Sequence, residues 1–294
     1  MTQTKSGLLL QGIGGFYYVE ADGQIYECKA RGAFRKRGQK PLAGDRVTIL
    51  LEEGGTTVTE IAPRKNSLIR PPVANLDQLF LITSMKEPSP NLLVLDKMIA
   101  VAESKGIEPV IVFTKTDLAD AAAYCEIYRK AGFPVIETSP ESESGIAEIR
   151  ERLQGRISAF AGNTGAGKST LLNRISPRFT RETGEISQKL GRGRHTTRSV
   201  ELLPLENGYV ADTPGFSTVD IERFDMVRKE DLPHAFREFA PYLEQCRFQS
   251  CAHIGEKGCA VCAAVQAGEI PRSRHDSYVA MYQEVKDIKE WQRR

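Results

Sequence analysis

The sequence has almost no net charge and no long hydrophobic run. Its 294 residues include 40 Lys and Arg against 38 Asp and Glu, which gives a formal net charge of +2. This balance excludes a uniformly basic nucleic-acid coat and an acidic disordered tail, although a local basic patch is compatible with it. No apolar run approaches the ~20 residues that span a bilayer, and the Leu8–Leu10 run is too short for the core of a signal peptide. We therefore expect a soluble, cytoplasmic protein without a membrane partner.

Cysteine is scarce except in one short window near the C-terminus. Four of the six cysteines lie between residues 246 and 262, together with one histidine. A tight cluster in a chain without an export signal favours a metal site over disulfides. Three thiolates and one imidazole are enough for a closed tetrahedral zinc site, whose role would be structural. The candidate ligands are Cys246, Cys251, His253 and Cys259, and Cys262 could take the place of His253.

The remaining cysteines and histidines carry no such signal. We expect Cys28 and Cys125 to be core residues, and we expect His234 and His275 to lie on the surface.

Internal repeats and low-complexity tracts are also absent, and the chain instead shows three kinds of segment. Residues 1–72 combine short apolar strands with glycine turns, which favours a small all-β barrel. Residues 73–222 alternate apolar strands with helices, the pattern of a parallel, doubly wound α/β sheet. Residues 223–294 lack strands and hold the metal window. The expected strands cover 16–19, 24–28, 47–51, 57–61, 78–83, 110–113, 135–137, 157–161 and 209–211, and the expected helices cover 92–105, 121–131 and, as a polar helix, 277–294.

A glycine-rich loop in the α/β segment fits the phosphate-loop pattern GxxxxGK[ST]. It follows an apolar strand and precedes a helix. Glycines let backbone N–H groups turn toward phosphate oxygens, Lys168 can bridge the β- and γ-phosphates, and Ser169 can ligate Mg²⁺. The loop predicts a nucleoside triphosphate site without distinguishing GTP from ATP. The predicted site includes Gly162, Asn163, Thr164, Gly165, Ala166, Gly167, Lys168, Ser169 and Thr170.

A second motif points to guanine. Residues 114–117, Thr-Lys-Thr-Asp, follow an apolar strand, where an open α/β sheet binds ligands, and they resemble the NKxD motif of GTPases. The Asp117 carboxylate can accept hydrogen bonds from N1–H and from the exocyclic amine of guanine, whereas adenine offers no such donor pair. Lys115 would lie along the base plane, and Thr114 replaces the usual Asn. The predicted base site includes Thr114, Lys115, Thr116, Asp117 and Ser139.

A third motif, Asp-Thr-Pro-Gly at 212–215, matches the DxxG pattern. In that pattern Asp212 would hold Mg²⁺ through water, and the Gly215 N–H would sense the γ-phosphate. The glycine-rich stretch 191–198 precedes the motif, and Thr196 or Thr197 could cap the magnesium ion.

The residue after this motif bears on the rate of hydrolysis. Phe216 stands where many GTPases have a Gln that orients the attacking water. We therefore expect slow intrinsic hydrolysis that requires an activating partner, with His195 as a candidate for positioning the water.

The order of the motifs is unusual. In ordinary GTPases the phosphate loop comes first and the base motif last, whereas here 114–117 precede 162–170 and 212–215 come last. Circular permutation preserves the sheet, because the termini of a domain often lie close together. The sequence thus predicts an α/β, circularly permuted P-loop GTPase domain.

This motif order, followed by the metal window, resembles the bacterial ribosome small-subunit-dependent GTPase A family over essentially the whole chain. The likeness includes Phe16–Val19, Pro41–Asp45 and Ile69–Pro72. The resemblance implies an OB-fold RNA-binding barrel over 1–72, a permuted GTPase domain over 73–222 and a helical zinc-binding domain over 223–294. In the family, one structural zinc is held at the positions of Cys246, Cys251, His253 and Cys259.

The resemblance also implies a partner. It describes a GTPase that binds the small ribosomal subunit and its rRNA, assists late maturation, hydrolyses GTP to GDP with stimulation by the subunit, and couples hydrolysis to release. An OB barrel is independently a common platform for single-stranded RNA. Residues 1–72 hold 11 Lys and Arg against 7 Asp and Glu, with Phe34 available to stack on a base. We expect a monomer that binds RNA and not DNA.

Two alternatives remain open. The phosphate loop alone would also fit an ATPase or a small-molecule kinase. A non-catalytic RNA-binding scaffold with a regulatory nucleotide site would keep the same domains, although the intact Lys168 and Ser169 favour an enzyme.

Overall fold

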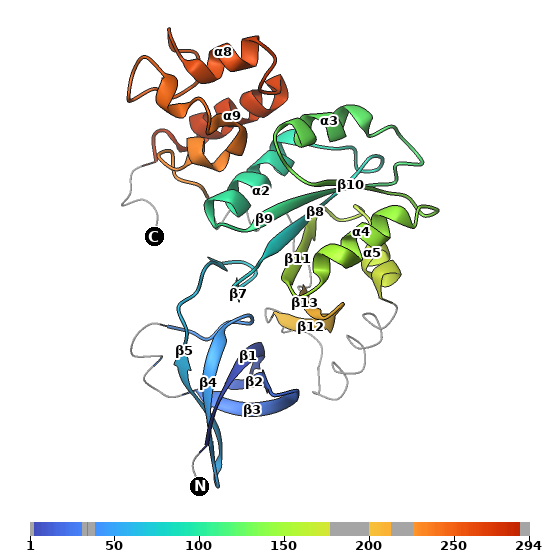
Figure 1. The fold of residues 1–294 in the computed structure, drawn as a ribbon, viewed down its shortest axis with the longest axis vertical. Helices are drawn as coiled ribbons and strands as arrows, with labels where there is room; N and C mark the ends of the chain where they lie inside the picture. Colours follow the sequence, from blue (N-terminus) through green and yellow to red (C-terminus); the bar gives the residue numbers. More distant parts are fainter. Residues whose placement is uncertain (1–2, 31–33, 35–38, 177–199, 213–225, 289–294) are drawn as a thin grey trace. The chain divides into compact units, whose positions relative to one another are not determined.

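The computed structural model describes residues 3–30, 34, 39–176, 200–212 and 226–288. The chain divides into two compact units, each assembled from three stretches of sequence (Figure 1). The first unit comprises Met1–Gln78, Ile146–Phe160 and Ser169–Phe216, and the second comprises Leu79–Gly145, Ala161–Lys168 and Ser217–Arg294.

The N-terminal part of the first unit is a five-stranded barrel. Its strands are β1 (Gln3–Ile13), β2 (Phe16–Ala21), β3 (Gln24–Ala30), β4 (Arg46–Glu52) and β5 (Gly55–Ile61). β1 pairs with both β2 and β4, β3 pairs with β2 and in parallel with β5, and β4 pairs with β5, so the ring closes. The core inside it includes Leu9, Val19, Cys28, Ile49 and Val58. The predicted all-β barrel is confirmed, although β1 is not among the expected strands because its first half is polar.

One expectation about the barrel is wrong. Phe34 is only 7% exposed and packs on the barrel core, so its ring is not available to stack on a base. An exposed aromatic ring of the barrel is instead Phe16, which opposes Lys29 across the β2–β3 pair. The Lys29 ammonium lies 5.7 Å from the centre of the Phe16 ring, within the range of a cation–π contact.

The barrel is joined to strands from much later in the chain. β12 (Glu201–Leu205) and β13 (Gly208–Asp212) form an antiparallel hairpin, and β1 pairs with β12 so that Gln11 lies opposite Glu201. The Gln11 amide donates a hydrogen bond to the Glu201 carboxylate at 3.2 Å, and Tyr209 donates one to Glu20 at 2.8 Å. Within the first unit, the barrel and this hairpin are therefore one packed body.

The α/β part of the first unit follows the predicted strand pattern. β11 (Ile157–Gly162) runs parallel to β13. The remaining elements are the short pair β6 (Ser67–Leu68) and β7 (Val73–Ala74) and the helices α4 (Ser144–Leu153) and α5 (Lys168–Ile175). β12 and α4 are not among the expected elements.

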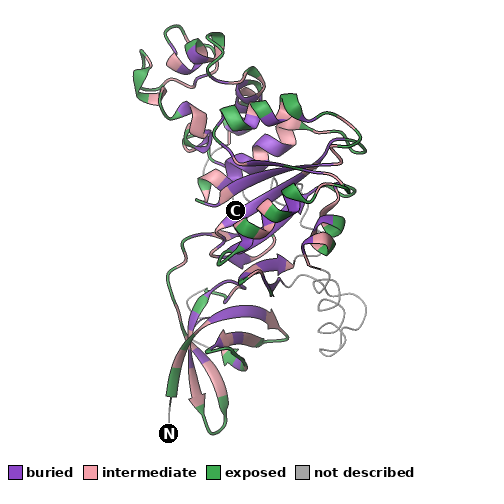
Figure 2. Ribbon diagram, turned by 45° about the vertical axis from the view of Figure 1, so that its right-hand side comes forward, coloured by how far each residue is buried: buried purple, intermediate pink, exposed green. Residues whose placement is uncertain are grey.

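The second unit contains the other predicted strands and helices. Its strands are β8 (Gln78–Ser84), β9 (Glu108–Thr114) and β10 (Val135–Thr138), with β9 between β8 and β10. β9 and β10 run parallel, and the helices α2 (Leu92–Ser104) and α3 (Ala122–Lys130) follow β8 and β9. Figure 2 shows β8 and β9 as buried along most of their length, as their near-continuous apolar sequences predict.

The C-terminal part of this unit is helical. It consists of three short 3₁₀ helices, η1 (Leu232–Ala235), η2 (Arg237–Phe239) and η3 (Leu243–Gln245), followed by α8 (Ala260–Gln266) and α9 (Arg272–Val285). The expectation of a polar helix over 277–294 is wrong in two respects. α9 begins directly after Pro271 and ends at Val285, and residues 289–294 lie outside the described residues. It also packs against α2 (Figure 1).

α9 also packs against the cysteine window, which buries one residue that the sequence alone places on the surface. His275 is 9% exposed, so the expectation of a surface position is wrong, whereas His234 is exposed as expected. His275 can be buried because its Nε2 lies 2.7 Å from the His253 carbonyl oxygen, which satisfies the ring. Cys28 and Cys125 are fully buried, as predicted.

A buried ionic network connects α9 with α2 and α3. The Arg274 guanidinium is completely buried and donates to Asp96 of α2 at 2.6 Å and to Glu238 at 2.7 Å. The Tyr128 hydroxyl of α3 donates to the same Asp96 oxygen at 3.0 Å. Burial raises the pKa of the Asp96 carboxyl, and the Arg274 charge opposes that shift. The network therefore holds three helices of the second unit around one carboxylate.

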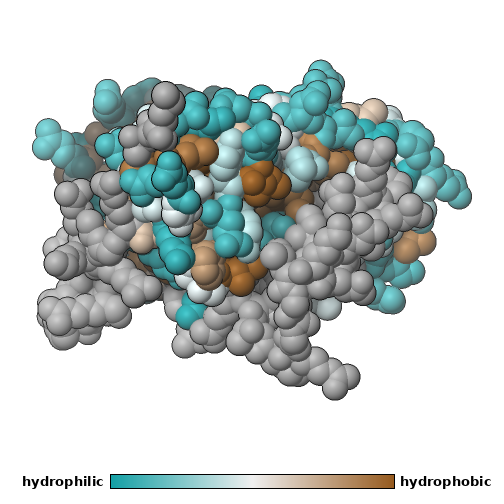
Figure 3. All heavy atoms as spheres, turned by 90° about the horizontal axis from the view of Figure 1, so that it is seen from below, coloured by the Kyte–Doolittle hydropathy of each residue, from teal (hydrophilic) through white to brown (hydrophobic). Residues whose placement is uncertain are grey.

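Among the described residues, no helix is both long and apolar enough to cross a bilayer. On the face drawn in Figure 3, hydrophobic residues form small separate groups among hydrophilic ones.

Candidate functional site

Three loops of the second unit meet at the ends of its strands. The base motif begins at Thr114, the last residue of β9, Ser139 directly follows β10, and the phosphate loop spans most of 161–168. Thr116 donates from its backbone N–H to the Thr138 carbonyl at 3.3 Å. The Thr114 hydroxyl donates to the Ala166 carbonyl of the phosphate loop at 2.8 Å. Segments about 50 residues apart in the sequence are therefore hydrogen-bonded to each other, as a single nucleotide site requires.

The phosphate loop depends on glycine at two places. A Cβ atom at Gly162 would lie 2.3 Å from the Ile82 carbonyl oxygen, so no side chain fits there. Gly167 has φ +91°, in the left-handed region that favours glycine. Between them, Asn163, Thr164 and Gly165 are exposed. The loop thus offers backbone donors to a ligand without side chains in the way.

Lys168 folds back over this loop. Its ammonium donates to the carbonyl oxygens of Gly162 and Asn163, the latter at 3.5 Å. Burial lowers the pKa of Lys168 from its ordinary value. Phosphate oxygens in the loop would offer this ammonium stronger, charged acceptors in place of the carbonyls.

Thr114 makes up for the missing Asn of the motif. An Asn at this position has an amide that can donate to the phosphate loop, and the Thr114 hydroxyl makes such a bond to Ala166. Thr114 is 6% exposed and Ala166 is 1% exposed, so water cannot replace that donor. The substitution therefore preserves the link between the base motif and the phosphate loop.

We predict that Thr114→Val weakens guanine nucleotide binding by about tenfold. Valine has nearly the same shape but no donor, and a buried carbonyl left without a partner costs roughly 1–3 kcal/mol. Titration with a fluorescent GDP analogue would measure the change. Thr114→Ser keeps the hydroxyl and serves as the control, and equal affinities for the valine and serine variants would contradict this role.

The Lys115 side chain contacts the loop at residues 86–87, which no sequence motif identifies as part of the site. Its ammonium donates to the carbonyls of Lys86 at 2.9 Å and of Glu87 at 2.8 Å. That loop is held in turn by Ser84, whose hydroxyl donates to the Lys86 carbonyl at 2.7 Å. No local sequence signal could have found these contacts, because backbone carbonyls carry no residue identity. These hydrogen bonds hold the Lys115 side chain in place, and its aliphatic stem is the part that lies along the base in the NKxD pattern.

Asp117 is exposed beyond the end of β9. The turn that presents it is closed by a hydrogen bond from the Leu118 N–H to the Lys115 carbonyl at 3.0 Å. Three residues later, the Asp120 carboxylate accepts the Ala122 N–H at 2.9 Å at the start of α3. Asp117 therefore projects from a fixed turn with its carboxylate open to a ligand.

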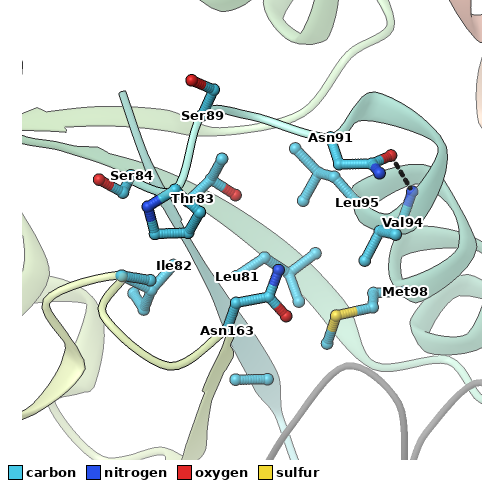
Figure 4. Close-up of a pocket in the computed structure, with 14 residues that line it drawn as sticks. Leu81, Ile82, Thr83, Ser84, Ser89, Asn91, Val94, Leu95, Met98 and Asn163 are labelled. Atoms are coloured by element: carbon cyan, nitrogen blue, oxygen red, sulfur yellow. Dashed lines mark hydrogen bonds between the residues drawn. The ribbon is translucent and has the colours of Figure 1, made fainter. Parts of the chain in front are cut away.

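A small cavity lies beside the phosphate loop (Figure 4). Its volume is about 30 Å³, and it is lined by the end of β8, the start of α2 and Asn163. The Asn91 side chain accepts the Val94 N–H at the same place and caps α2. The cavity holds about one water molecule, so it is too small for a nucleotide, which would have to bind across the exposed surface of the loop.

The other predicted nucleotide residues are divided between the first unit and the undescribed part. Ser169 and Thr170 are exposed at the start of α5, and Asp212 ends β13. Thr196, Thr197, His195, Gly215 and Phe216 lie outside the described residues.

The cysteine window forms a compact donor cluster. The donor atoms of Cys246, Cys251, His253 and Cys259 all lie within 4.8 Å of one another. His253 Nδ1 is 3.5 Å from the Cys246 sulfur and 3.6 Å from the Cys259 sulfur, and these two sulfurs are 4.0 Å apart. A tetrahedral zinc ion with ordinary bond lengths requires about 3.6 Å between nitrogen and sulfur and about 3.8 Å between sulfurs. The donor set therefore fits zinc, and Cys262 is not part of it.

The surroundings of the cluster orient its donors. The backbone N–H of Ala260 donates to the Cys246 sulfur at 3.4 Å. The Glu256 carboxylate accepts the N–H groups of Ala252 at 2.8 Å and of Ile254 at 3.0 Å, on either side of His253. Burial raises the pKa of Cys251 to about 12 and that of Cys259 to about 11, so these thiols keep their protons near neutral pH unless a cation displaces them.

Comparison with protein families gives two matches. The model described as RsgA GTPase matches residues 61–222, and the model described as RsgA N-terminal domain matches residues 6–58. A protein of Geobacillus kaustophilus named small ribosomal subunit biogenesis GTPase RsgA is 45% identical over 290 residues, which cover 96% of this chain and 98% of the relative. A protein of the same name from Caldanaerobacter subterraneus is 47% identical over 286 residues, or 96% of each chain.

Solved structures show the same likeness. The chain resembles YloQ, described as a circularly permuted GTPase, with a TM-score of 0.81 and 35% identity over 98% of this chain and 96% of that one. It resembles YjeQ from Thermotoga maritima with a TM-score of 0.81 and 34% identity over 98% of this chain and 100% of that one.

Proposed function

The chain belongs to the RsgA GTPase family, and from this membership we propose that it binds the small ribosomal subunit, assists its late maturation and leaves it on hydrolysis of GTP. As a member of this family it is a GTP hydrolase with a role in ribosome biogenesis. The hydrogen bond from Thr114 to Ala166 carries the assignment of the site, because it joins a guanine-reading motif to a phosphate loop.

Each nucleotide-site residue has a proposed role. Asp117 reads the guanine edge, with Lys115 along the base and Ser139 beside it. Lys168 and the backbone of 162–167 bind the β- and γ-phosphates, and Ser169 ligates Mg²⁺. Asp212 acts on Mg²⁺ through water, Gly215 senses the γ-phosphate, Thr196 or Thr197 caps the ion, and His195 positions the water.

We also propose one structural zinc ion at Cys246, Cys251, His253 and Cys259. The donor distances and the absence of an open position support it. Zinc would tie the loop that carries Cys246 and Cys251 to the start of α8, where Cys259 is the N-cap residue.

The remaining assignments follow from the partner. We propose that the barrel binds rRNA and that the domains span 1–72, 73–222 and 223–294. We propose that the protein is a monomer and acts in the bacterial cytoplasm, where ribosomes assemble. In this role it binds neither DNA nor membranes.

Turnover measurements test the proposal. We expect small ribosomal subunits to raise the rate of GTP hydrolysis at least about tenfold, which corresponds to ~1.4 kcal/mol of transition-state stabilisation. Large subunits serve as the control for ribosomal RNA in general, and Lys168→Ala should abolish turnover under every condition. A rate that small subunits leave unchanged would contradict the proposed coupling, and turnover of ATP at the same rate would contradict the proposed base selection.

A further inference from the structure

A fifth sulfur lies beside the four-donor cluster. Cys262 is three residues after the proposed ligand Cys259, yet its sulfur is outside the group of donor atoms that could share one ion. It is partly exposed, whereas Cys259 is buried. Four donors already complete a tetrahedral zinc shell, so the Cys262 thiol is not needed as a ligand.

The local helix geometry brings the two cysteines together. Cys259 is the N-cap residue of α8, and Cys262 is the third residue of that helix. The Cys259 sulfur accepts the Cys262 backbone N–H at 3.4 Å. The start of the helix thus places Cys262 directly beside the Cys259 sulfur.

Other contacts hold the Cys262 sulfur on the side of the cluster. It lies 3.7 Å from the His253 carbonyl oxygen and 3.9 Å from His275 Nε2. Both residues belong to the packed wall around the metal donors, since His275 Nε2 also lies 2.7 Å from the same carbonyl oxygen. The Cys262 sulfur therefore lies beside the metal-donor cluster, and its partial exposure leaves it open to a small oxidant.

We propose that Cys259 and Cys262 are a redox pair, which a peroxide converts to a disulfide with loss of one ligand from the metal centre. This inference rests on the proposed zinc site. It makes the C-terminal segment sensitive to oxidants, because the thiol that reacts first is held against a thiol that the metal needs.

The chemistry uses one equivalent of peroxide. The Cys262 sulfur attacks a peroxide oxygen, the O–O bond breaks, and a sulfenic acid and one water molecule form. The Cys259 sulfur then attacks the Cys262 sulfur, the S–S bond forms, and the S–O bond breaks to release a second water molecule. The two sulfurs lose two electrons, which the peroxide gains. Solvent supplies the proton of the second water when Cys259 begins as a metal-bound thiolate.

Zinc release from the full-length chain tests this pair. The zinc-loaded protein and its Cys262→Ser variant are treated with hydrogen peroxide, and a chromogenic chelator follows the released ion. We expect the wild type to lose zinc at least tenfold faster than Cys262→Ser. Cys28→Ala, which removes a buried cysteine far along the chain, should behave as the wild type. Equal rates for the wild type and Cys262→Ser would overturn the proposal.

Mass spectrometry of the oxidised protein identifies the bond. We expect a disulfide between Cys259 and Cys262, and a disulfide between Cys246 and Cys251 in its place would overturn the proposal. Zinc content before oxidation tests the metal site separately. Cys262→Ser should contain as much zinc as the wild type, and a lower content would make Cys262 a ligand and overturn its role as the oxidant-reactive partner. A wild type that binds no zinc would instead refute the proposed metal site.

Discussion

Replacing Arg274 with Met should lower the free energy of unfolding by about 3–5 kcal/mol, because it leaves buried carboxylates without their counter-charge. The Arg274 side chain is completely buried, and its two partners, Asp96 and Glu238, are 1% and 5% exposed. Methionine fills similar volume, so the loss of charge rather than a cavity dominates the effect. Urea unfolding should show the change as a lower midpoint, and hydrogen exchange should locate it in α9 and α2.

Two further variants isolate the cause. Arg272→Met lies on the same helix, but its side chain is 78% exposed and its ion pair with Asp276 is at the surface, so its effect should stay below about 0.5 kcal/mol. Adding Asp96→Asn and Glu238→Gln to Arg274→Met should recover part of the loss, because neutral amides cost less to bury than charges. If the two single Arg variants are equally stable, the buried network does not hold these helices together.

Replacing Asp117 with Asn should reverse the base preference. In the proposed site the carboxylate would accept two hydrogen bonds from guanine, each worth about 1.5–3 kcal/mol for a charged acceptor, so GTP affinity should fall by roughly 10²–10⁴-fold. Asparagine keeps one acceptor and adds a donor, which matches the N1–H and the 2-carbonyl oxygen of xanthine. Xanthosine triphosphate should therefore bind the variant more tightly than GTP does, as competition against a fluorescent nucleotide would show.

The chain offers a matched control for this change. Asp120→Asn makes the same chemical substitution three residues later, where the carboxylate accepts the Ala122 N–H at the start of α3, and it should leave the preference for GTP unchanged. The turn that presents Asp117 is closed by backbone hydrogen bonds, so Asp117→Asn should not disturb it. A variant that still prefers GTP over xanthosine triphosphate would show that another group reads the base.

The sequence predicts elements whose determinants are local. β8 and β9 are recognisable because strands buried on both faces are almost continuously apolar, and the phosphate loop because its glycines have fixed spacing. The cysteine cluster is likewise recognisable from spacing and residue type, whereas the choice of His253 over Cys262 rests on the family resemblance. In each case the residues that determine the feature lie within 13 positions of one another.

Features that depend on distant partners escape such reasoning. Burial of Arg274 requires Asp96, which lies 178 positions earlier in the chain. No local sequence pattern predicts that pairing. Phe34 is buried because the barrel closes around it, which depends on pairing between strands rather than on its neighbours. The early start of α9 is an exception, since Pro271 is a helix-start signal that could have placed it.

The pairing of β1 with β12 matters to anyone who cuts this chain into fragments. A fragment that begins after residue 72 would lack β1, and the backbone of β12 on that side would lose its partner. Glu201, 8% exposed in the whole chain, would also lose the Gln11 amide. A newly bared strand edge is a template for aggregation. A fragment without the barrel should therefore aggregate more readily than the whole chain, which light scattering of the two would measure.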